Sequence, residues 1–200
     1  MLLLFVGCAK EKGTFTRDED GYGYTDEKSG VHYVIQDATF EAARAGEEIG
    51  YYEEEKSGYQ RKFHAIPELD SARFLTDGSG NVYCADGETL DVSSWMITNL
   101  YVCEEDAVGV ARGFVTDAAS LASIKAAWLD GEEAELPLTK ATHARRLKMV
   151  SSEHPNIYYC ISFFVYEDGS AYFRLAEERI TRAVPSEITA ILLAAEKVAE

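Results

Sequence analysis

The stretch TDAASLASIKAAWLDG, residues 116–131, carries the clearest helix signal in this 200-residue chain. Its large apolar side chains recur at helical spacing and predict one buried stripe: Leu121, Ile124 and Trp128. Thr116 or Asp117 is placed to cap the start, and Gly131 is placed to end the helix. We therefore expect a helix over about residues 117–130 that covers one face of a sheet.

Strand patterns lie on both sides of this helix. Residues 95–103 are apolar on both faces, which is typical of a central strand. Residues 49–63 read as a hairpin that turns at Lys56-Ser57-Gly58. A second amphipathic helix is expected over about 185–199, opened by Pro185. Because strands outnumber helices and hairpins dominate, the sequence predicts an α+β fold with a mainly antiparallel sheet of hairpins and two amphipathic helices.

One expected strand, HARRLKMVS from His143, has a basic character in an otherwise acidic chain. A basic strand could form a small positive patch. Charged residues are also common on exposed edge strands, where they prevent edge-to-edge aggregation. We therefore interpret this segment as a solvated edge of the sheet.

The composition is that of a globular protein, with 46% hydrophobic residues, 12 tyrosines and a formal net charge of −16. So negative a chain is a poor ligand for nucleic acid, because binding phosphates requires lysine and arginine. Simple adsorption on anionic lipid headgroups is disfavoured for the same reason. The charge is best explained by solubility. Some tyrosines could line a binding surface, although most are expected to pack in the sheet.

The sequence carries no recognised motif for catalysis, cofactor binding or metal binding. The sequence contains no HExxH, GxSxG or Cys-His signature, and its histidines are dispersed: His32, His64, His143 and His154. The segments DEDGYGYTDEKS and DGSGNVYCADGE resemble calcium loops only in part and are better explained as turns. We expect no enzyme activity, no cofactor and no metal. The alternative is a hydrolase with dispersed Asp, Glu and His residues, because catalytic groups are assembled in space.

The four cysteines are Cys8, Cys84, Cys103 and Cys160. None lies in a CxxC pair or has a histidine at ligand spacing, which disfavours a zinc site. Cys84 and Cys103 could pair, but both lie in strand-like runs where a cysteine commonly serves as a small buried hydrophobe. Free, buried thiols are the favoured interpretation.

The first ten residues, MLLLFVGCAK, change abruptly from apolar to polar after Cys8. Phe5-Val6-Gly7-Cys8 resembles the cleavage region of bacterial lipoproteins. The resemblance implies a diacylglyceryl group on the Cys8 sulfur, further acylation such as palmitate, and cleavage before Cys8. Two acyl chains hold a protein firmly on a membrane. The apolar run is short and no basic residue precedes it, so we interpret it as a signal peptide that begins upstream.

These observations divide the chain into a truncated signal peptide (1–7), a lipidated cysteine with a polar tether (8–30) and a single α+β domain (31–200). Val115-Thr116-Asp117 and residues 184–188 are similar to segments of uncharacterised lipoproteins of Gram-positive bacteria. The resulting expectation is a lipid-anchored protein on the extracytoplasmic face of the cell membrane. We expect its domain to be a non-catalytic module that binds a protein or glycan partner, with an envelope hydrolase as the alternative. A cytoplasmic protein with a misread start is a third possibility.

Overall fold

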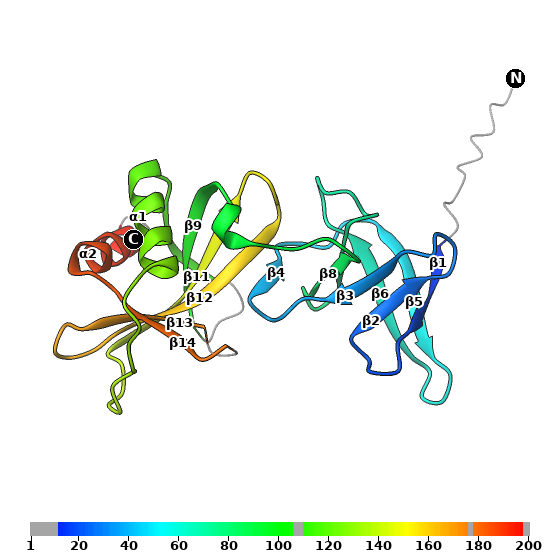
Figure 1. Ribbon diagram of the computed structural model, residues 1–200, viewed down its shortest axis with the longest axis horizontal. Helices are drawn as coiled ribbons and strands as arrows, with labels where there is room; N and C mark the ends of the chain where they lie inside the picture. Colours follow the sequence, from blue (N-terminus) through cyan, green and yellow to red (C-terminus); the bar gives the residue numbers. More distant parts are fainter. Residues whose placement is uncertain (1–11, 106–109, 176–177, 198–200) are drawn as a thin grey trace, which may run out of the picture.

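The computed structural model describes residues 12–105, 110–175 and 178–197. The first part of the chain forms a closed barrel (Figure 1). Its strands are β1 (Gly13–Arg17), β2 (Gly23–Asp26), β3 (His32–Ile35), β5 (Glu48–Glu54), β6 (Tyr59–Ala65), β7 (Phe74–Asp77) and β8 (Val82–Ala85). They follow the order β1-β2-β3-β8-β7-β6-β5, and a parallel pairing of β1 with β5 closes the barrel.

Aromatic side chains fill the barrel. The buried set is Phe15, Tyr24, Tyr33, Phe63, Leu75, Tyr83 and Ala85. The rings of Phe15 and Phe63 have their centroids 4.5 Å apart, and Tyr24 meets Phe63 edge-on at 4.9 Å. Every second residue of a strand points inward, so one large side chain from most of these short strands is sufficient to fill this interior.

The second sheet contains β9 (Ile97–Glu104), β10 (Ala111–Val115), β11 (His143–Ser151), β12 (Ile157–Val165), β13 (Ala171–Leu175) and β14 (Ile180–Ala183). Its order is β10-β9-β11-β12-β13-β14, all antiparallel. The short strand β4 (Phe40–Ala42) also pairs with β12, so the chain enters this sheet before it completes the barrel. Two helices lie against one face of the sheet, α1 (Ala118–Leu129) and α2 (Ser186–Lys197) (Figure 1).

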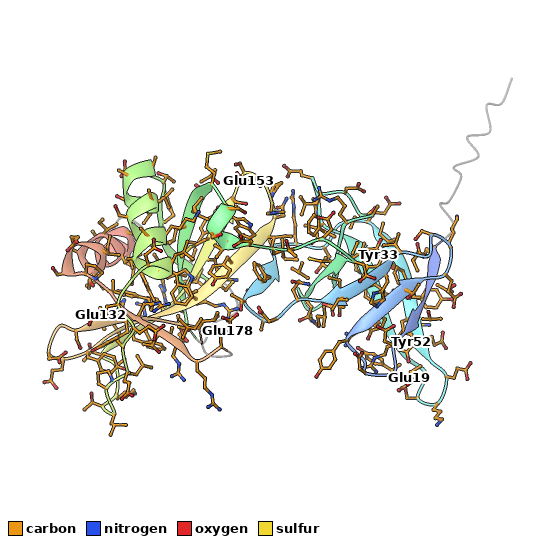
Figure 2. The ribbon with its side chains drawn as sticks, in the orientation of Figure 1. Glu19, Tyr33, Tyr52, Glu132, Glu153 and Glu178 are labelled. Carbon is orange, nitrogen blue, oxygen red and sulfur yellow. The ribbon has the colours of Figure 1, made fainter. Side chains whose placement is uncertain are left out.

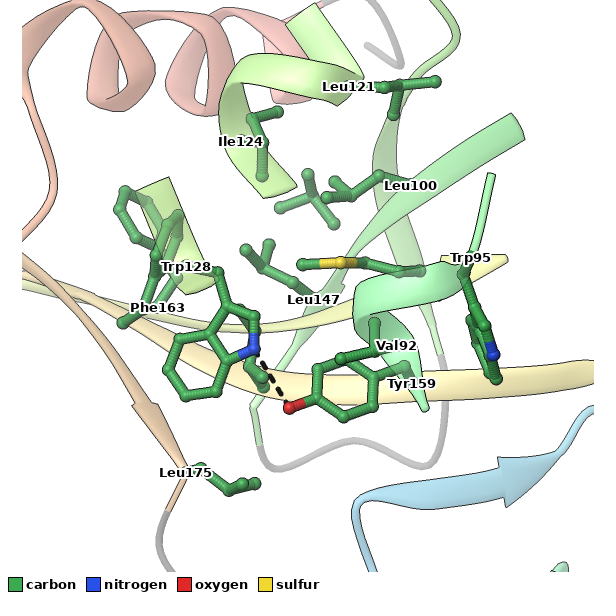
Figure 3. Close-up of a cluster of buried hydrophobic side chains, with 14 of the residues drawn as sticks. Val92, Trp95, Leu100, Leu121, Ile124, Trp128, Leu147, Tyr159, Phe163 and Leu175 are labelled. Atoms are coloured by element: carbon green, nitrogen blue, oxygen red, sulfur yellow. Dashed lines mark hydrogen bonds between the residues drawn. The ribbon is translucent and has the colours of Figure 1, made fainter. Parts of the chain in front are cut away.

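The largest hydrophobic core lies between these helices and the sheet (Figure 3). Leu121, Ile124 and Trp128 of α1 are buried in it, as the periodicity predicted. Asp117 caps the helix by accepting a hydrogen bond from the Ser120 backbone N–H. Burying each such side chain contributes roughly 1.5–3 kcal/mol. The same core extends to the outer wall of the barrel through Phe74 and Val82, which joins the two sheets.

The predicted α+β fold with one sheet of hairpins is wrong. Within the described residues the protein is mostly β, with a closed barrel and a separate second sheet. Two helices occupy 118–129 and 186–197, but they cover only the second sheet. The error arose because barrel closure depends on pairing between distant short strands, which leaves no local pattern.

The tether expected over residues 8–30 also needs correction. Residues 13–17 and 23–26 form β1 and β2 of the barrel. Most of their side chains are polar and solvent-facing, which gave the segment the composition of a linker, whereas Phe15 and Tyr24 point inward. The expected signal peptide (1–7) and Cys8 lie outside the described residues.

Candidate functional site

A cleft of about 610 Å³ lies where the barrel meets the second sheet. Three parts of the chain form its walls: residues 36–40, which run into β4, residues 88–92, which run into the 3-10 turn η1 (Val92–Ser94), and the end of α1 with β12 and β14. This volume is in the range of small-molecule sites. The lining residues are Gln36, Asp37, Thr39, Phe40, Glu88, Thr89, Leu90, Asp91, Val92, Trp128, Leu129, Tyr159, Glu178, Ile180 and Arg182.

Three aromatic side chains line one wall of the cleft. The Phe40 and Tyr159 rings have their centroids 5.4 Å apart, and Trp128 lies 6.4 Å from Tyr159. The Trp128 indole N–H donates a hydrogen bond of 3.0 Å to the Tyr159 hydroxyl (Figure 3). Burial raises the pKa of Tyr159 to about 12, so this hydroxyl keeps its proton at neutral pH. Its oxygen accepts from the indole, and its own proton can be donated to a ligand.

Two buried polar groups at this cleft have no hydrogen-bond partner among the described residues. They are the Arg182 Nε of β14 and the Thr39 hydroxyl, whose residue is only 3% exposed. Arg182 Nη1 contacts Glu133 Oε1 at 3.0 Å, which fixes one side of the guanidinium. Buried donors are nearly always satisfied in folded proteins, so unpaired ones at a cleft indicate a place for a ligand or water.

Four carboxylates also line the cleft: Asp37, Glu88, Asp91 and Glu178. Glu88 accepts two hydrogen bonds from Arg73, at 2.7 and 2.6 Å, and this arginine holds the pKa of Glu88 below its usual value. Asp91 caps η1, and its bonds from Ser93 lower its pKa. Both groups are therefore ionised acceptors, and neither is suited to act as a general acid at neutral pH.

The other two carboxylates differ in how firmly they are held. Asp37 accepts a hydrogen bond of 2.9 Å from the Thr39 backbone N–H, which fixes the turn before β4. Glu178 is exposed and lies near the side of the second sheet that faces the barrel (Figure 2). Asp37 and Glu178 can therefore accept hydrogen bonds at the mouth of the cleft.

The four histidines do not line this cleft. Each sits in its own environment, and the partners are Asp18 and Asp86 for His32, the Gly46 carbonyl for His64, Glu196 for His143, and the rings of Trp95 and Phe74 for His154. They are therefore not brought together into one site. The hydrolase alternative loses its histidines at the cleft and would depend on carboxylates alone.

Cys84, Cys103 and Cys160 are buried free thiols, which confirms the favoured interpretation over a Cys84–Cys103 pair. Burial raises the pKa of Cys84 and of Cys160 to about 12, so both remain protonated at neutral pH. Protonated, enclosed thiols are poor nucleophiles. Cys8, the residue expected to be lipidated, lies outside the described part of the chain.

The chain matches no protein-family model, no curated protein and no solved structure. Within residues 12–105, 110–175 and 178–197, side chains that could hold a metal ion do not cluster. The same ranges contain no helix with the length and apolarity needed to cross a bilayer. The assignment of a function therefore depends on the geometry of the cleft.

The cleft was not anticipated from the sequence. Trp128 was expected only as part of a core stripe, and the segments that form the walls come from five places spread over residues 36–182. Charged residues such as Arg182 stand out only after the strand containing them has been placed beside the barrel. Sequence periodicity locates strands, but it does not show which of them meet.

The basic strand was also misplaced. β11 pairs with β9 on one side and β12 on the other, so it is central and not an edge. The Lys148 side chain is only 8% exposed and contacts Glu41 Oε1 of β4 at 2.7 Å. Lys148 therefore belongs to a partly buried face of a central strand, where it pairs with a carboxylate.

Proposed function

We propose that this protein is a non-catalytic binding module that takes a short glycan in the cleft between the barrel and the second sheet. The unpartnered Arg182 Nε beside the aromatic wall is the observation that carries the proposal. Of the two expected partner classes, a folded protein could insert only a side chain into about 610 Å³, whereas a short glycan fits as a whole.

The chemistry of the walls suits a sugar. A sugar ring has apolar C–H faces that can lie against Phe40, Trp128 and Tyr159, and hydroxyls that both donate and accept. Arg182 and the Tyr159 hydroxyl supply donors, while Asp37 and Glu178 supply acceptors. Because the lining carries four carboxylates, we expect neutral or amino sugars to bind better than uronic acids.

Calorimetric titration with a panel of neutral disaccharides tests the proposal. Binding should be lost or weakened about tenfold or more in Arg182→Gln, because a hydrogen bond to a charged group is removed. Arg44→Gln is the matched control, since Arg44 and its partner Glu68 are both exposed and lie outside the cleft. Equal affinities of Arg182→Gln and Arg44→Gln for every bound sugar would overturn the assignment of the site.

The same titrations separate a binder from an enzyme. A bound disaccharide should be recovered intact after prolonged incubation with the protein. Cleavage that disappears in Asp37→Asn or Glu178→Gln would replace the binding proposal with the envelope hydrolase. The engagement of Glu88 and Asp91 with their own partners favours the first outcome.

We also propose that the module is anchored through Cys8 to the extracytoplasmic face of the cell membrane. Gly13 begins β1, so four residues separate it from Cys8, and the five Cα-to-Cα steps between the two span at most about 18 Å. The barrel would therefore lie close to the bilayer. Metabolic labelling with palmitate and fractionation of cells that express the protein natively should place the wild type in membranes and Cys8→Ser in the soluble fraction. Equal solubility of the two proteins would contradict the proposed lipid anchor.

A further inference from the structure

A polar row crosses the sheet face opposite the helices. Arg146 of β11 is paired with Ser162 of β12, and Ser162 is paired with Arg174 of β13. Directly paired residues of neighbouring strands point to the same side of a sheet. The register therefore places a hydroxyl between two guanidinium groups on adjacent strands.

A small pocket of about 100 Å³ lies over this row. Arg146, Ser162 and Arg174 all line it, together with Ala38 and Thr39 on the segment before β4. The volume is well below that of a drug-sized site and suits a single small group. The register places Arg146, Ser162 and Arg174 on the sheet face opposite to Tyr159 and Arg182 of the glycan cleft. Thr39 lines both pockets.

Neither arginine has its donors fully used within the described residues. Arg146 Nε is buried without a hydrogen-bond partner, and its Nη2 lies 3.4 Å from the Ala38 carbonyl oxygen and 3.6 Å from a Glu41 carboxylate oxygen. The Cys160 thiol, which also lines the pocket, interacts with the same guanidinium group. Arg174 has no hydrogen-bond or ion-pair partner in the described ranges. Guanidinium groups with unused donors in a pocket are suited to bind an oxyanion, often in bidentate geometry.

A carboxylate of the chain itself shows that the site accepts negative charge. Ser162 Oγ donates a hydrogen bond of 3.0 Å to Glu105 Oε1, just after the end of β9. Glu41 supplies a second carboxylate nearby and is held by Lys148. Arg146, Arg174 and Lys148 thus outnumber the carboxylates of Glu41 and Glu105 by one charge around this pocket, on a chain whose net charge is −16.

We propose that Arg146, Ser162 and Arg174 form a binding site for a small oxyanion, with the phosphate group of a monoester as the best fit. Two guanidinium groups match a doubly charged phosphate, and the Ser162 hydroxyl can donate to a third oxygen. The Glu105 carboxylate occupies the Ser162 donor in the free protein, and the incoming anion displaces it. The site does not depend on the glycan proposal.

Calorimetric titration of the full chain with inorganic phosphate tests the site. We expect saturable binding that Arg174→Gln weakens about tenfold or more, since a charged hydrogen-bond donor is lost. Glu105→Gln should bind phosphate more tightly than the wild type, because a competing carboxylate is removed. Arg44→Gln, which changes the net charge equally at an exposed site away from the pocket, should bind as the wild type does. Thermal unfolding of each variant checks that it is folded.

Two further titrations identify the source of the phosphate. Phosphoethanolamine presents a soluble monoester, and vesicles containing phosphatidic acid present the same group in a lipid headgroup. Binding of either that is lost in Arg174→Gln supports the site and assigns its source. Absence of saturable phosphate binding in both the wild type and folded Glu105→Gln would overturn the proposal, as would equal affinity in Arg174→Gln and Arg44→Gln.

Discussion

Trp128 of α1 donates its indole N–H to the hydroxyl of Tyr159 on β12, across 3.0 Å of otherwise apolar core. This bond connects a helix to the sheet beneath it and positions two residues of the cleft wall. Trp95 differs from Trp128 in one useful respect. Trp95 is also buried, but its Nε1 has no hydrogen-bond partner among the described residues.

The first prediction compares the two tryptophans. Trp128→Phe should lower the free energy of unfolding by about 1 kcal/mol more than Trp95→Phe, because only the former removes a hydrogen bond. Both substitutions remove the same ring atoms from a buried position. Urea unfolding followed by circular dichroism measures the difference. Equal losses would show that the bond to Tyr159 contributes nothing net to stability.

The second prediction concerns His32, whose ring nitrogens lie 2.8 Å from carboxylate oxygens of Asp18 and Asp86. The hydrogen bonds that the charged ring donates, first to Asp18 and then to Asp86, raise the pKa of His32 above 6.5. The folded state thus prefers the charged imidazole, and the resulting stability is fully present below pH 6.5 and lost as pH rises through the folded-state pKa. The free energy of unfolding should therefore fall more between pH 6 and 8.5 in the wild type than in His32→Gln.

The third prediction concerns His154, which acts in the opposite direction. Burial lowers the pKa of His154, whose ring packs against Trp95 and Phe74. The folded state prefers the neutral imidazole, so this contribution to stability is present above pH 6.5 and is lost as pH falls through the folded-state pKa. Unfolding measurements between pH 5 and 7 should show a smaller loss of stability on acidification in His154→Phe than in the wild type. If the free energy of unfolding depends on pH equally in His154→Phe and the wild type, the lowered pKa of His154 does not contribute to stability.

Local features of the fold could be predicted from the sequence. The stripe of Leu121, Ile124 and Trp128 predicted α1, because a helix places such residues on one face. The hairpin of β5 and β6 was predicted from its turn around Gly58, and the two strands pair as expected. In each case the pattern and the structure it specifies lie within one short stretch of the chain.

Long-range features could not be predicted in the same way. Gly13 of β1 pairs with Gly50 of β5, and nothing in either short strand indicates the other. The cleft depends on one further step, the packing of the barrel against the second sheet. Arg182 and Phe40 come to line the same cleft only in the packed structure. A site formed at such a junction is specified by packing, which one sequence does not display.

The fourth prediction tests the closure of the barrel at Gly50. A Cβ at this position would lie 2.3 Å from the Gly13 carbonyl oxygen and 2.8 Å from the Phe15 ring, so backbone would have to move. Gly50→Ala should therefore destabilise the protein by about 1–3 kcal/mol, the usual range for overpacking. Gly78→Ala is the matched control, because a Cβ at Gly78 meets nothing within 4 Å. The urea midpoint should fall in Gly50→Ala and stay near the wild-type value in Gly78→Ala. If both variants unfold like the wild type, close approach of β1 and β5 does not limit the stability of the barrel.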